Sequence, residues 1–223
     1  MIKVKKMHIL DLFCGTKCVS KCAEKLGHST FSVDIEPRFE PSKVYDLLND
    51  LDKELIEQIY KADIIFMSPP CNTFSMACGN RYWNADHTPK NETAVNAQKL
   101  LYRCLHIAMF CENNKNCENN NKKYYVIENP RARARWFLPE NNRQTVWYCQ
   151  YGIDRAKPTD IWTNIPFTAK GCKNNSPTCH HKKAPRGSTT GTQGRDILEK
   201  YSIPEMLLSE LIQNAEKDRK KYM

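Results

Sequence analysis

The chain of 223 residues is long enough for one sizeable domain with its own hydrophobic core. Its net charge of +9 favours a polyanionic partner such as nucleic acid. No segment has the length and apolarity of a membrane span, and the basic start at residues 1–6 lacks the apolar stretch of a secretory signal. The 11 scattered cysteines predict reduced thiols rather than a disulfide framework, in a cytoplasmic, nuclear or viral replication compartment.

The first third of the chain alternates short apolar runs with helical patterns. A helical pattern follows the first apolar run and ends near Gly27, a plausible C-terminal cap. An amphipathic helix is predicted over residues 51–60. Strands are predicted over residues 7–13, 30–33, 44–48 and 63–67. Strands that alternate with helices are typical of βαβ units and therefore predict a parallel sheet.

The remainder continues this alternation without an internal repeat or a clean linker. Helices are predicted over residues 94–111 and from 203 to 212, and strands or β-like runs over 124–127, 145–151 and 159–162. We therefore expect one domain over residues 1–223, with a Rossmann-like α/β fold, a mostly parallel twisted sheet and helices on both of its faces. A monomer is expected.

Reactive or acidic side chains follow three of the predicted strands. Asp34 follows the second strand, Cys71 follows two prolines that end the fourth, and Glu128 ends the fifth. Open α/β sheets keep their chemistry at the carboxyl ends of their strands, so these residues are expected at one edge. Cys71 is a candidate nucleophile, with a small apolar filler as the alternative. Gly15, after the first strand, would let the backbone approach a ligand.

Taken in order, these segments resemble the motifs of the DNA (cytosine-5) methyltransferase family, over about residues 7–164. Residues 11–15, Asp-Leu-Phe-Cys-Gly, are similar to the family's first motif, which contacts S-adenosylmethionine. Asp34-Ile35 is similar to the second, and Asp50 lies where a family carboxylate binds the adenine amine. The resemblance implies the methyltransferase version of the fold and cofactor contacts from Asp11, Phe13, Cys14, Gly15, Asp34, Ile35, Asp50 and Pro70.

The family's reactive motifs match two further segments. Residues 70–75, Pro-Cys-Asn-Thr-Phe-Ser, match the nucleophile motif Pro-Cys-x-x-Phe-Ser, and Glu128-Asn129 matches the pair that reads and activates the target cytosine. Tyr151-Gly152, followed by Arg155 and Lys157, is similar to a later basic motif near the substrate. The resemblance implies catalytic roles for Cys71, Glu128 and Lys157, and substrate contacts from Ser75, Asn129 and Arg155.

The implied chemistry is methyl transfer to cytosine C5 in DNA. Cys71 would attack C6 as a thiolate, and Glu128 would hydrogen-bond the base and polarise N3. The base must leave the stack for the thiol to reach it, and the loop over residues 76–91 is predicted to be a mobile lid whose Arg81, Tyr82 and Trp83 fill the gap or contact phosphate. An ordinary surface loop is the alternative.

Two other functions stay open at this stage. The same chemistry on RNA, tRNA in particular, uses an equally accessible cytosine. A non-catalytic nucleic-acid-binding relic is suggested by departures from the family pattern: Lys17 and Cys18 stand where the first motif has more glycines, Pro130 stands where the family has Val, and residues 200–204 lack the Gly-Asn pair of the last motif.

Residues 168–195 form a basic, Gly-rich stretch that is the one candidate for a reduced target-recognition segment. We expect Arg186 there, together with Arg131 and Arg133 beside Glu128, to contact phosphate. Alternating arginines at 131, 133 and 135 are also consistent with one exposed strand-like face. No metal is favoured, but a zinc-stapled loop is a second interpretation because the stretch contains Cys172, Cys179 and His180.

Overall fold

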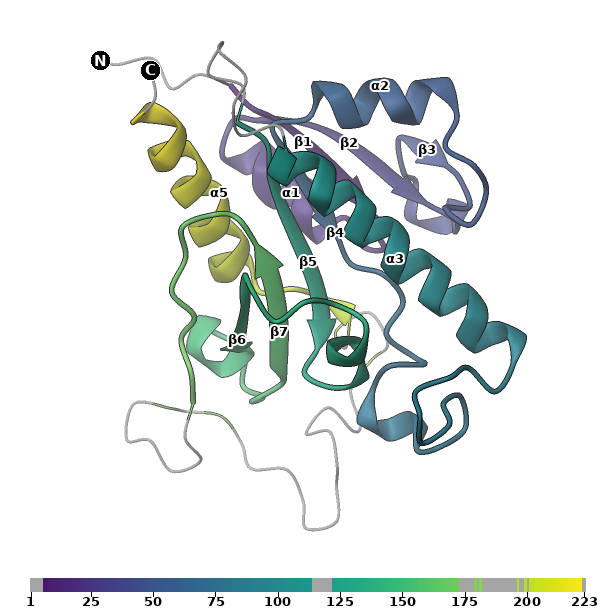
Figure 1. The fold of residues 1–223 in the computed structure, drawn as a ribbon. Coiled ribbons are helices and arrows are strands. Elements are labelled where there is room, and N and C mark those ends of the chain that lie inside the picture. The colour runs from purple at the N-terminus through teal and green to yellow at the C-terminus, as the bar shows by residue number, and fades with distance from the viewer. Residues whose placement is uncertain are drawn as a thin grey trace.

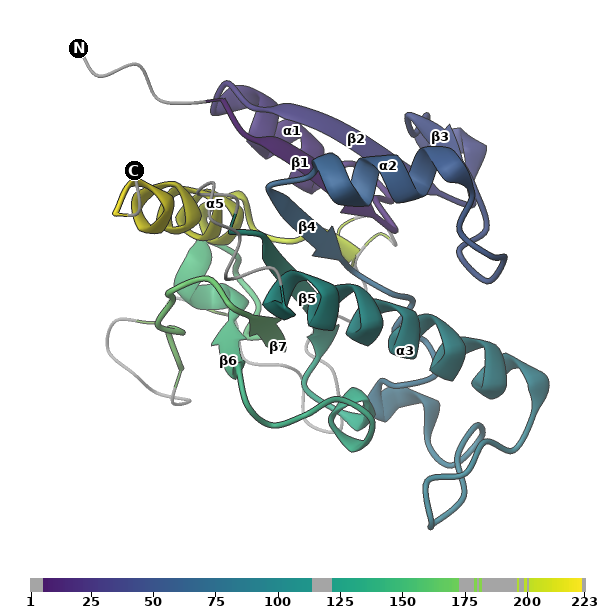
Figure 2. The same ribbon diagram turned by 45° about the horizontal axis from the view of Figure 1, so that its top comes forward.

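A computed structural model describes residues 6–113, 122–172, 179, 181, 196, 199 and 201–221. Its centre is a seven-stranded sheet in the order β3-β2-β1-β4-β5-β7-β6 (Figure 1, Figure 2). The strands are β1 (His8–Leu12), β2 (Ser29–Asp34), β3 (Lys43–Val44), β4 (Ile64–Met67), β5 (Tyr124–Pro130), β6 (Arg143–Trp147) and β7 (Pro158–Thr163). β7 pairs antiparallel with both β5 and β6, and the other pairings are parallel. The predicted α/β fold with a mostly parallel sheet is confirmed.

Helices cover both faces of the sheet, as expected. They are α1 (Cys18–Lys25), α2 (Lys53–Lys61), α3 (Glu92–Asn113) and α5 (Glu205–Lys220). In β4, Ile64 and Phe66 pack with α1 and α5, whereas Ile65 and Met67 pack with α2 and α3. This strict alternation arises because successive strand side chains point to opposite faces. A central strand buried on both faces has to be apolar throughout, and β4 is.

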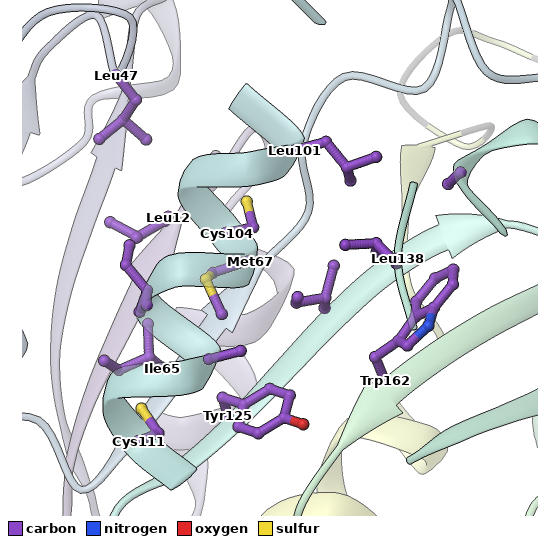
Figure 3. Packing of buried hydrophobic residues seen from close by; sticks show 14 of the residues in the cluster. Leu12, Leu47, Ile65, Met67, Leu101, Cys104, Cys111, Tyr125, Leu138 and Trp162 are labelled. Carbon is purple, nitrogen blue, oxygen red and sulfur yellow. The ribbon is translucent and has the colours of Figure 1, made fainter. Parts of the chain in front are cut away.

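The larger of the two cores lies under α3. Leu101, Cys104 and Cys111 of this helix pack over Ile65 and Tyr125 of the sheet (Figure 3). Each of these five side chains is at most 5% exposed. The helix crosses the front of the sheet in Figure 1. No helix among the described residues has the length and apolarity needed to cross a bilayer.

Two predicted strands differ from the structure. The run expected at residues 44–48 contributes only a two-residue strand, because the chain turns away from the β2 edge and buries Leu47 under the core. The run expected at residues 145–151 divides into β6 and a 3₁₀ turn, η5 (Tyr148–Tyr151). Gly152 ends that turn with a φ of 88°, a left-handed conformation in which glycine carries no steric penalty.

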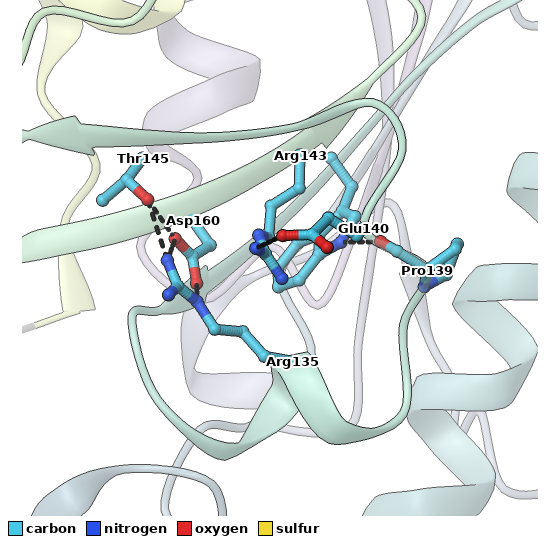
Figure 4. Close-up of polar contacts among 7 residues, drawn as sticks. Arg135, Pro139, Glu140, Arg143, Thr145 and Asp160 are labelled. Carbon is cyan, nitrogen blue, oxygen red and sulfur yellow. Dashed lines mark hydrogen bonds and ion pairs between the residues drawn. The ribbon is translucent and has the colours of Figure 1, made fainter.

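A buried ion pair fastens β7 to the segment that follows β5. Asp160 is fully buried, and its two carboxylate oxygens accept hydrogen bonds from Nε and Nη2 of Arg135 at 2.5 and 2.6 Å (Figure 4). The hydroxyl of Thr145 on β6 donates to the same carboxylate at 2.7 Å. The carboxylate is therefore satisfied only while three separate segments stay together.

Removal of the arginine should destabilise the fold strongly. Arg135→Ala leaves a buried carboxylate without its cation, and we expect a loss of about 3 kcal/mol in the free energy of unfolding. Arg143→Ala is the matched control, since its partner Glu140 is 88% exposed and such a pair contributes less than about 1 kcal/mol. Urea denaturation followed by circular dichroism measures both losses. Equal losses would contradict the assigned role of the Asp160 pair.

Candidate active site

A cavity of about 390 Å³ opens at the carboxyl ends of β1, β2, β4 and β5. The reactive residues predicted from separate segments meet in it: Asp11, Gly15, Asp34, Cys71 and Glu128. Phe13, Cys14, Ile35 and Pro70 line it as well. Parallel pairing brings these strand ends to one edge of the sheet, as expected from the sequence.

The wall formed by the β1–α1 turn is built on unusual backbone geometry. Phe13, Gly15 and Lys17 have φ values of 61°, 46° and 57°, all in the left-handed region. The tight turn aims the amide of Gly15 at Asp34, whose Oδ2 accepts it at 2.8 Å. The Asp34 Oδ1 accepts the amide of Glu36 at 2.9 Å. The two strand ends are thereby locked together across the cavity floor.

Asp11 is the deepest carboxyl of this wall. It is 3% exposed and accepts hydrogen bonds from the hydroxyl and the amide of Ser20, at 2.7 and 3.2 Å. Burial raises the pKa of Asp11 to about 7, although the bonds from Ser20 oppose that shift. This carboxyl therefore stabilises the first turn of α1 and still presents negative charge to the cavity near neutral pH.

The loop that carries Cys71 is fixed from inside the core. The Cys71 carbonyl accepts the amides of Phe74 at 3.0 Å and Ser75 at 2.9 Å, which forms a tight turn directly after the strand. Phe74 is fully buried and stacks on Trp83 with ring centroids 5.5 Å apart. The indole of Trp83 donates to the carbonyl of Thr73 at 2.8 Å. Phe74 thus anchors the loop from the core and is not among the residues that line the cavity.

This packing corrects the expectation for the 76–91 loop. Trp83 is 2% exposed and contributes to the core, so it cannot fill the gap left by an extruded base. Arg81 is exposed and Tyr82 is half-buried, with the Arg81 guanidinium 6.0 Å from the tyrosine ring centroid. The sequence of this polar segment did not indicate which of its aromatic rings would be buried in the core.

The alternating arginines are also corrected. Arg133 does not lie on an exposed strand-like face, because residues 133–136 form a 3₁₀ turn and its side chain is buried. Its Nη1 donates to the Ser75 carbonyl at 2.9 Å, and its backbone amide donates to the Phe74 carbonyl at 3.0 Å. Arg133 is therefore a positioning residue for the Cys71 loop. Arg131 is exposed, and Arg135 is held by Asp160.

Glu128 projects into the cavity from β5 and is 9% exposed. Its Oε1 accepts a hydrogen bond from the hydroxyl of the buried Tyr148 at 2.9 Å. Burial raises the pKa of Glu128, while the charge of Lys157 and the bond from Tyr148 act in the opposite direction. The ammonium of Lys157 lies 4.5 Å from the Tyr148 ring centroid. Lys157 is not among the residues that line the cavity, but its positive charge opposes the rise in the pKa of Glu128.

Asn129 connects the two reactive strand ends. It is fully buried, and its Nδ2 donates to the carbonyl of Pro69 at 3.1 Å. Among the described residues its Oδ1 has no hydrogen-bond partner. Of the other predicted substrate residues, Ser75 is half-buried and Arg155 lies 3.7 Å from the carboxylate of Asp154. Arg186 and His180 lie outside the described residues.

Asp46, rather than the Asp50 expected from the resemblance, is among the residues that line the cavity. Asp50 does not line the cavity, and its backbone carbonyl accepts the Tyr45 hydroxyl. Asp46 lines the cavity instead, next to Leu47. Both positions carry an Asp-Leu pair, at 46–47 and 50–51, so the sequence offered two equivalent candidates. Tyr201 and Ile203, from the segment before α5, also line the cavity and carried no motif.

Cys71 is held as a thiol by its surroundings. Burial, followed by the negative charge of Glu128, raises the pKa of Cys71 to about 11, and the charge of Lys157 opposes this only in part. Thiolate is the nucleophilic form of cysteine. At neutral pH Cys71 is therefore a thiol, and the negative charge of Glu128 contributes to keeping it in that form.

Alkylation should reveal this dependence. We expect the rate of Cys71 modification by iodoacetamide, followed by peptide mass spectrometry, to rise roughly tenfold per pH unit between about pH 7 and pH 10, because the thiolate fraction does so below the pKa. Glu128→Gln removes the negative charge and should accelerate the reaction at pH 8. Glu140→Gln, at an exposed carboxylate, should leave the rate unchanged. A modification rate that does not change with pH above pH 7 would contradict the raised pKa of Cys71.

Comparison with solved structures finds similarity between this chain and methyltransferases. The chain is similar to S. pombe Dnmt2 methyltransferase, with 14% identity, a TM-score of 0.45 and coverage of 74% of this chain and 52% of that one. It is similar to Entamoeba histolytica methyltransferase EhMeth, with 14% identity, a TM-score of 0.42 and coverage of 75% and 56%. For a Spodoptera frugiperda DNMT2 mutant the values are 17%, 0.41, 74% and 53%.

The chain thus spans about half the length of the solved structures it matches. No family model matches the sequence, and a comparison with curated proteins gives no match. At this level of similarity the functional assignment has to rest on the site itself.

Proposed function

We propose that this protein transfers a methyl group from S-adenosylmethionine to C5 of cytosine in nucleic acid, with DNA as the favoured substrate. The observation that carries the proposal is the meeting of Cys71 and Glu128 in one cavity with Asp11, Gly15 and Asp34. The first pair matches the reactive motifs of cytosine-5 methyltransferases, and the other three match the cofactor motif of the same family. An accidental set of motif matches would not converge on one pocket.

The cavity has features that suit the cofactor. Ile35 lines it and is 57% exposed, as expected for an apolar side chain that a flat ring covers when bound. Leu47, Leu100 and Pro70 supply further apolar wall. A Cβ added at Gly15 would meet nothing within 4 Å, so the turn leaves open space beside its backbone. Asp34 and Asp46 are placed to accept hydrogen bonds from ribose hydroxyls and an adenine amine.

The charge of the cavity also favours a cationic ligand. Although the chain carries a net charge of +9, the charged side chains that line this cavity are one arginine and four acids. These are Arg38, Asp11, Asp34, Asp46 and Glu128. When bound, S-adenosylmethionine supplies an electrophilic methyl group on a positively charged sulfonium, and the acidic lining attracts such a group.

The protein's own residues carry the remaining chemistry. The thiol of Cys71 gives its proton to solvent and Sγ forms a bond to C6 of the cytosine, while the electrons of the C5–C6 double bond shift toward C5 and N3. Glu128, whose pKa is raised by burial, takes up a proton as the base binds and donates a hydrogen bond to N3. This neutral form of Glu128 no longer opposes ionisation of Cys71. After methylation a base removes the C5 proton, the bond between Sγ and C6 breaks, and the ring double bond is restored. Tyr148 keeps the Glu128 carboxyl aimed at the base.

Cofactor binding tests the carboxylate assignment. We expect Asp46→Ala to raise the Kd for S-adenosylmethionine by about tenfold or more, since a hydrogen bond to a charged group contributes roughly 1.5–3 kcal/mol. Asp50→Ala, four residues away and outside the cavity, should leave the Kd unchanged. Isothermal titration calorimetry measures both, and thermal melts check that each variant is folded. The opposite result would restore Asp50 as the ligand.

Methyl transfer from labelled cofactor tests the reaction itself. Cys71→Ala should abolish transfer, and Glu128→Gln should lower its rate by about 10²–10⁴-fold because the proton donor to N3 is lost. Cys78→Ser is the matched control: its sulfur is a hydrogen-bond donor to the Thr73 carbonyl in the same loop, and a hydroxyl keeps that role. Undiminished transfer by Cys71→Ala would refute the covalent mechanism.

The same assay decides the substrate. Duplex DNA and tRNA, presented side by side at equal cytosine concentration, should show faster transfer to DNA. Faster transfer to tRNA would favour the RNA alternative and leave the chemistry intact. Absence of cofactor binding by the wild-type chain would instead favour the non-catalytic relic.

A further inference from the structure

A second cluster of metal-binding side chains lies outside the cavity. The Sγ atoms of Cys149, Cys172 and Cys179 and a ring nitrogen of His181 all lie within 4.8 Å of one another. His181 Nδ1 is 2.7 Å from the Cys179 sulfur and 3.7 Å from the Cys172 sulfur. Cys149 and Cys172 are buried, at 2% and 6% exposed. We propose that these four residues form a structural zinc site.

The composition and size of the cluster suit tetrahedral zinc. Three thiolates and one imidazole are a common ligand set for closed structural sites, with Zn–S and Zn–N distances of about 2.3 and 2.0 Å. Ligand atoms at the corners of such a tetrahedron are about 3.5–3.8 Å apart. The observed spread requires only small side-chain adjustments. A disulfide would use two of the three thiols and leave the third and the imidazole unexplained, and all three cysteines are free.

The site differs from the zinc interpretation of the sequence. That interpretation used Cys172, Cys179 and His180, whereas the structure includes the neighbouring His181 and adds Cys149. Cys149 is 23 residues before Cys172 and belongs to η5, so its participation follows from folding alone. Four ligands in place of three complete a closed coordination shell, and a closed shell indicates a structural site rather than a catalytic one.

Hydrogen bonds bring the cluster together before any metal binds. The segment after β7 runs beside β6, where the Gln144 side chain bonds the Phe167 carbonyl at 2.6 Å and the Ala169 amide at 2.8 Å. The Lys170 carbonyl accepts the Trp147 amide at 3.1 Å. These contacts deliver Cys172, two residues later, to Cys149. Strand β6, at the edge of the sheet, thus positions two of the four proposed ligands, Cys149 and Cys172, before a metal binds.

The location gives the site a consequence for the cavity. Cys149 directly follows Tyr148, whose hydroxyl holds the Glu128 carboxyl. A metal bound to Cys149 therefore fixes η5 and, through it, the orientation of Tyr148. It also ties down the start of the basic stretch that contains Arg186 in the sequence. The zinc site would act as a staple between the segment after β7 and the turn that supports Glu128.

The metal content of the full chain tests the proposal directly. Protein purified from zinc-supplemented cells should contain about one zinc per chain by inductively coupled plasma mass spectrometry. Cys172→Ser and His181→Ala should lose most of it. His180→Ala, the adjacent histidine, and Cys111→Ser, a buried cysteine of α3, are the matched controls and should retain it.

Cobalt substitution of the wild-type chain supplies a readout that does not depend on folded variants. Bound Co²⁺ should show the intense visible bands of a tetrahedral thiolate site, and addition of Zn²⁺ should bleach them. Metal should also protect Cys149, Cys172 and Cys179, but not Cys71, from alkylation. A wild-type chain that takes up neither metal, or a disulfide among these three cysteines by intact-mass analysis, would overturn the proposal. Zinc loss in His180→Ala but not in His181→Ala would overturn the ligand assignment.

Discussion

The parallel pairing of β4 with β5 determines where the reactive groups of the cavity lie. Met67 and Ile127 are register partners at the end of this pairing. Glu128 is the next residue on β5, and Cys71 follows four residues after Met67. A slip of one residue would turn Glu128 to the opposite face of the sheet, because strand side chains alternate. The Asn129–Pro69 hydrogen bond holds the two ends in this register. The placement of Cys71 beside Glu128 therefore depends on this strand pairing, which the Asn129 amide reinforces.

Much of this arrangement was predictable because local pattern and tertiary fold agree. Apolar runs of four to seven residues, each ended by a Pro, Asp or Gly signal, defined most strands, and strand order along the chain placed Asp34, Cys71 and Glu128 at one edge. Strand β5 extends through Glu128-Asn129 to Pro130, beyond its apolar run. Its polar end survives in the sheet because β7 pairs with it there, which no local pattern in β5 records.

The features that the sequence did not predict share a physical cause. Arg133 and Trp83 carry no local mark of burial, and each is buried by a contact with the Cys71 loop, which is distant in sequence. Asp46 and Asp50 sit in equivalent Asp-Leu pairs, and only the path of the chain after β3 brings Asp46 to the cavity. The sequence does not distinguish His181 from the adjacent His180 as a metal ligand, because only the fold brings Cys149 close to His181. Each of these assignments required a partner that is far away in the sequence.

The charge of the cavity lining is opposite in sign to the net charge of the chain. The chain carries a net charge of +9, yet the charged side chains that line its cavity are mainly acids. Burial raises the pKa of Asp11 to about 7 and also raises the pKa of Glu128, so burial disfavours the charged form of both carboxyl groups. Burial, together with the negative charge of Glu128, holds Cys71 as a thiol. In the proposed reaction the bound cytosine forms a hydrogen bond with protonated Glu128. The negative charge that disfavours ionisation of Cys71 is then absent. On this proposal the bound substrate promotes ionisation of Cys71, whereas the free protein keeps the group as a thiol, which is less readily oxidised than a thiolate.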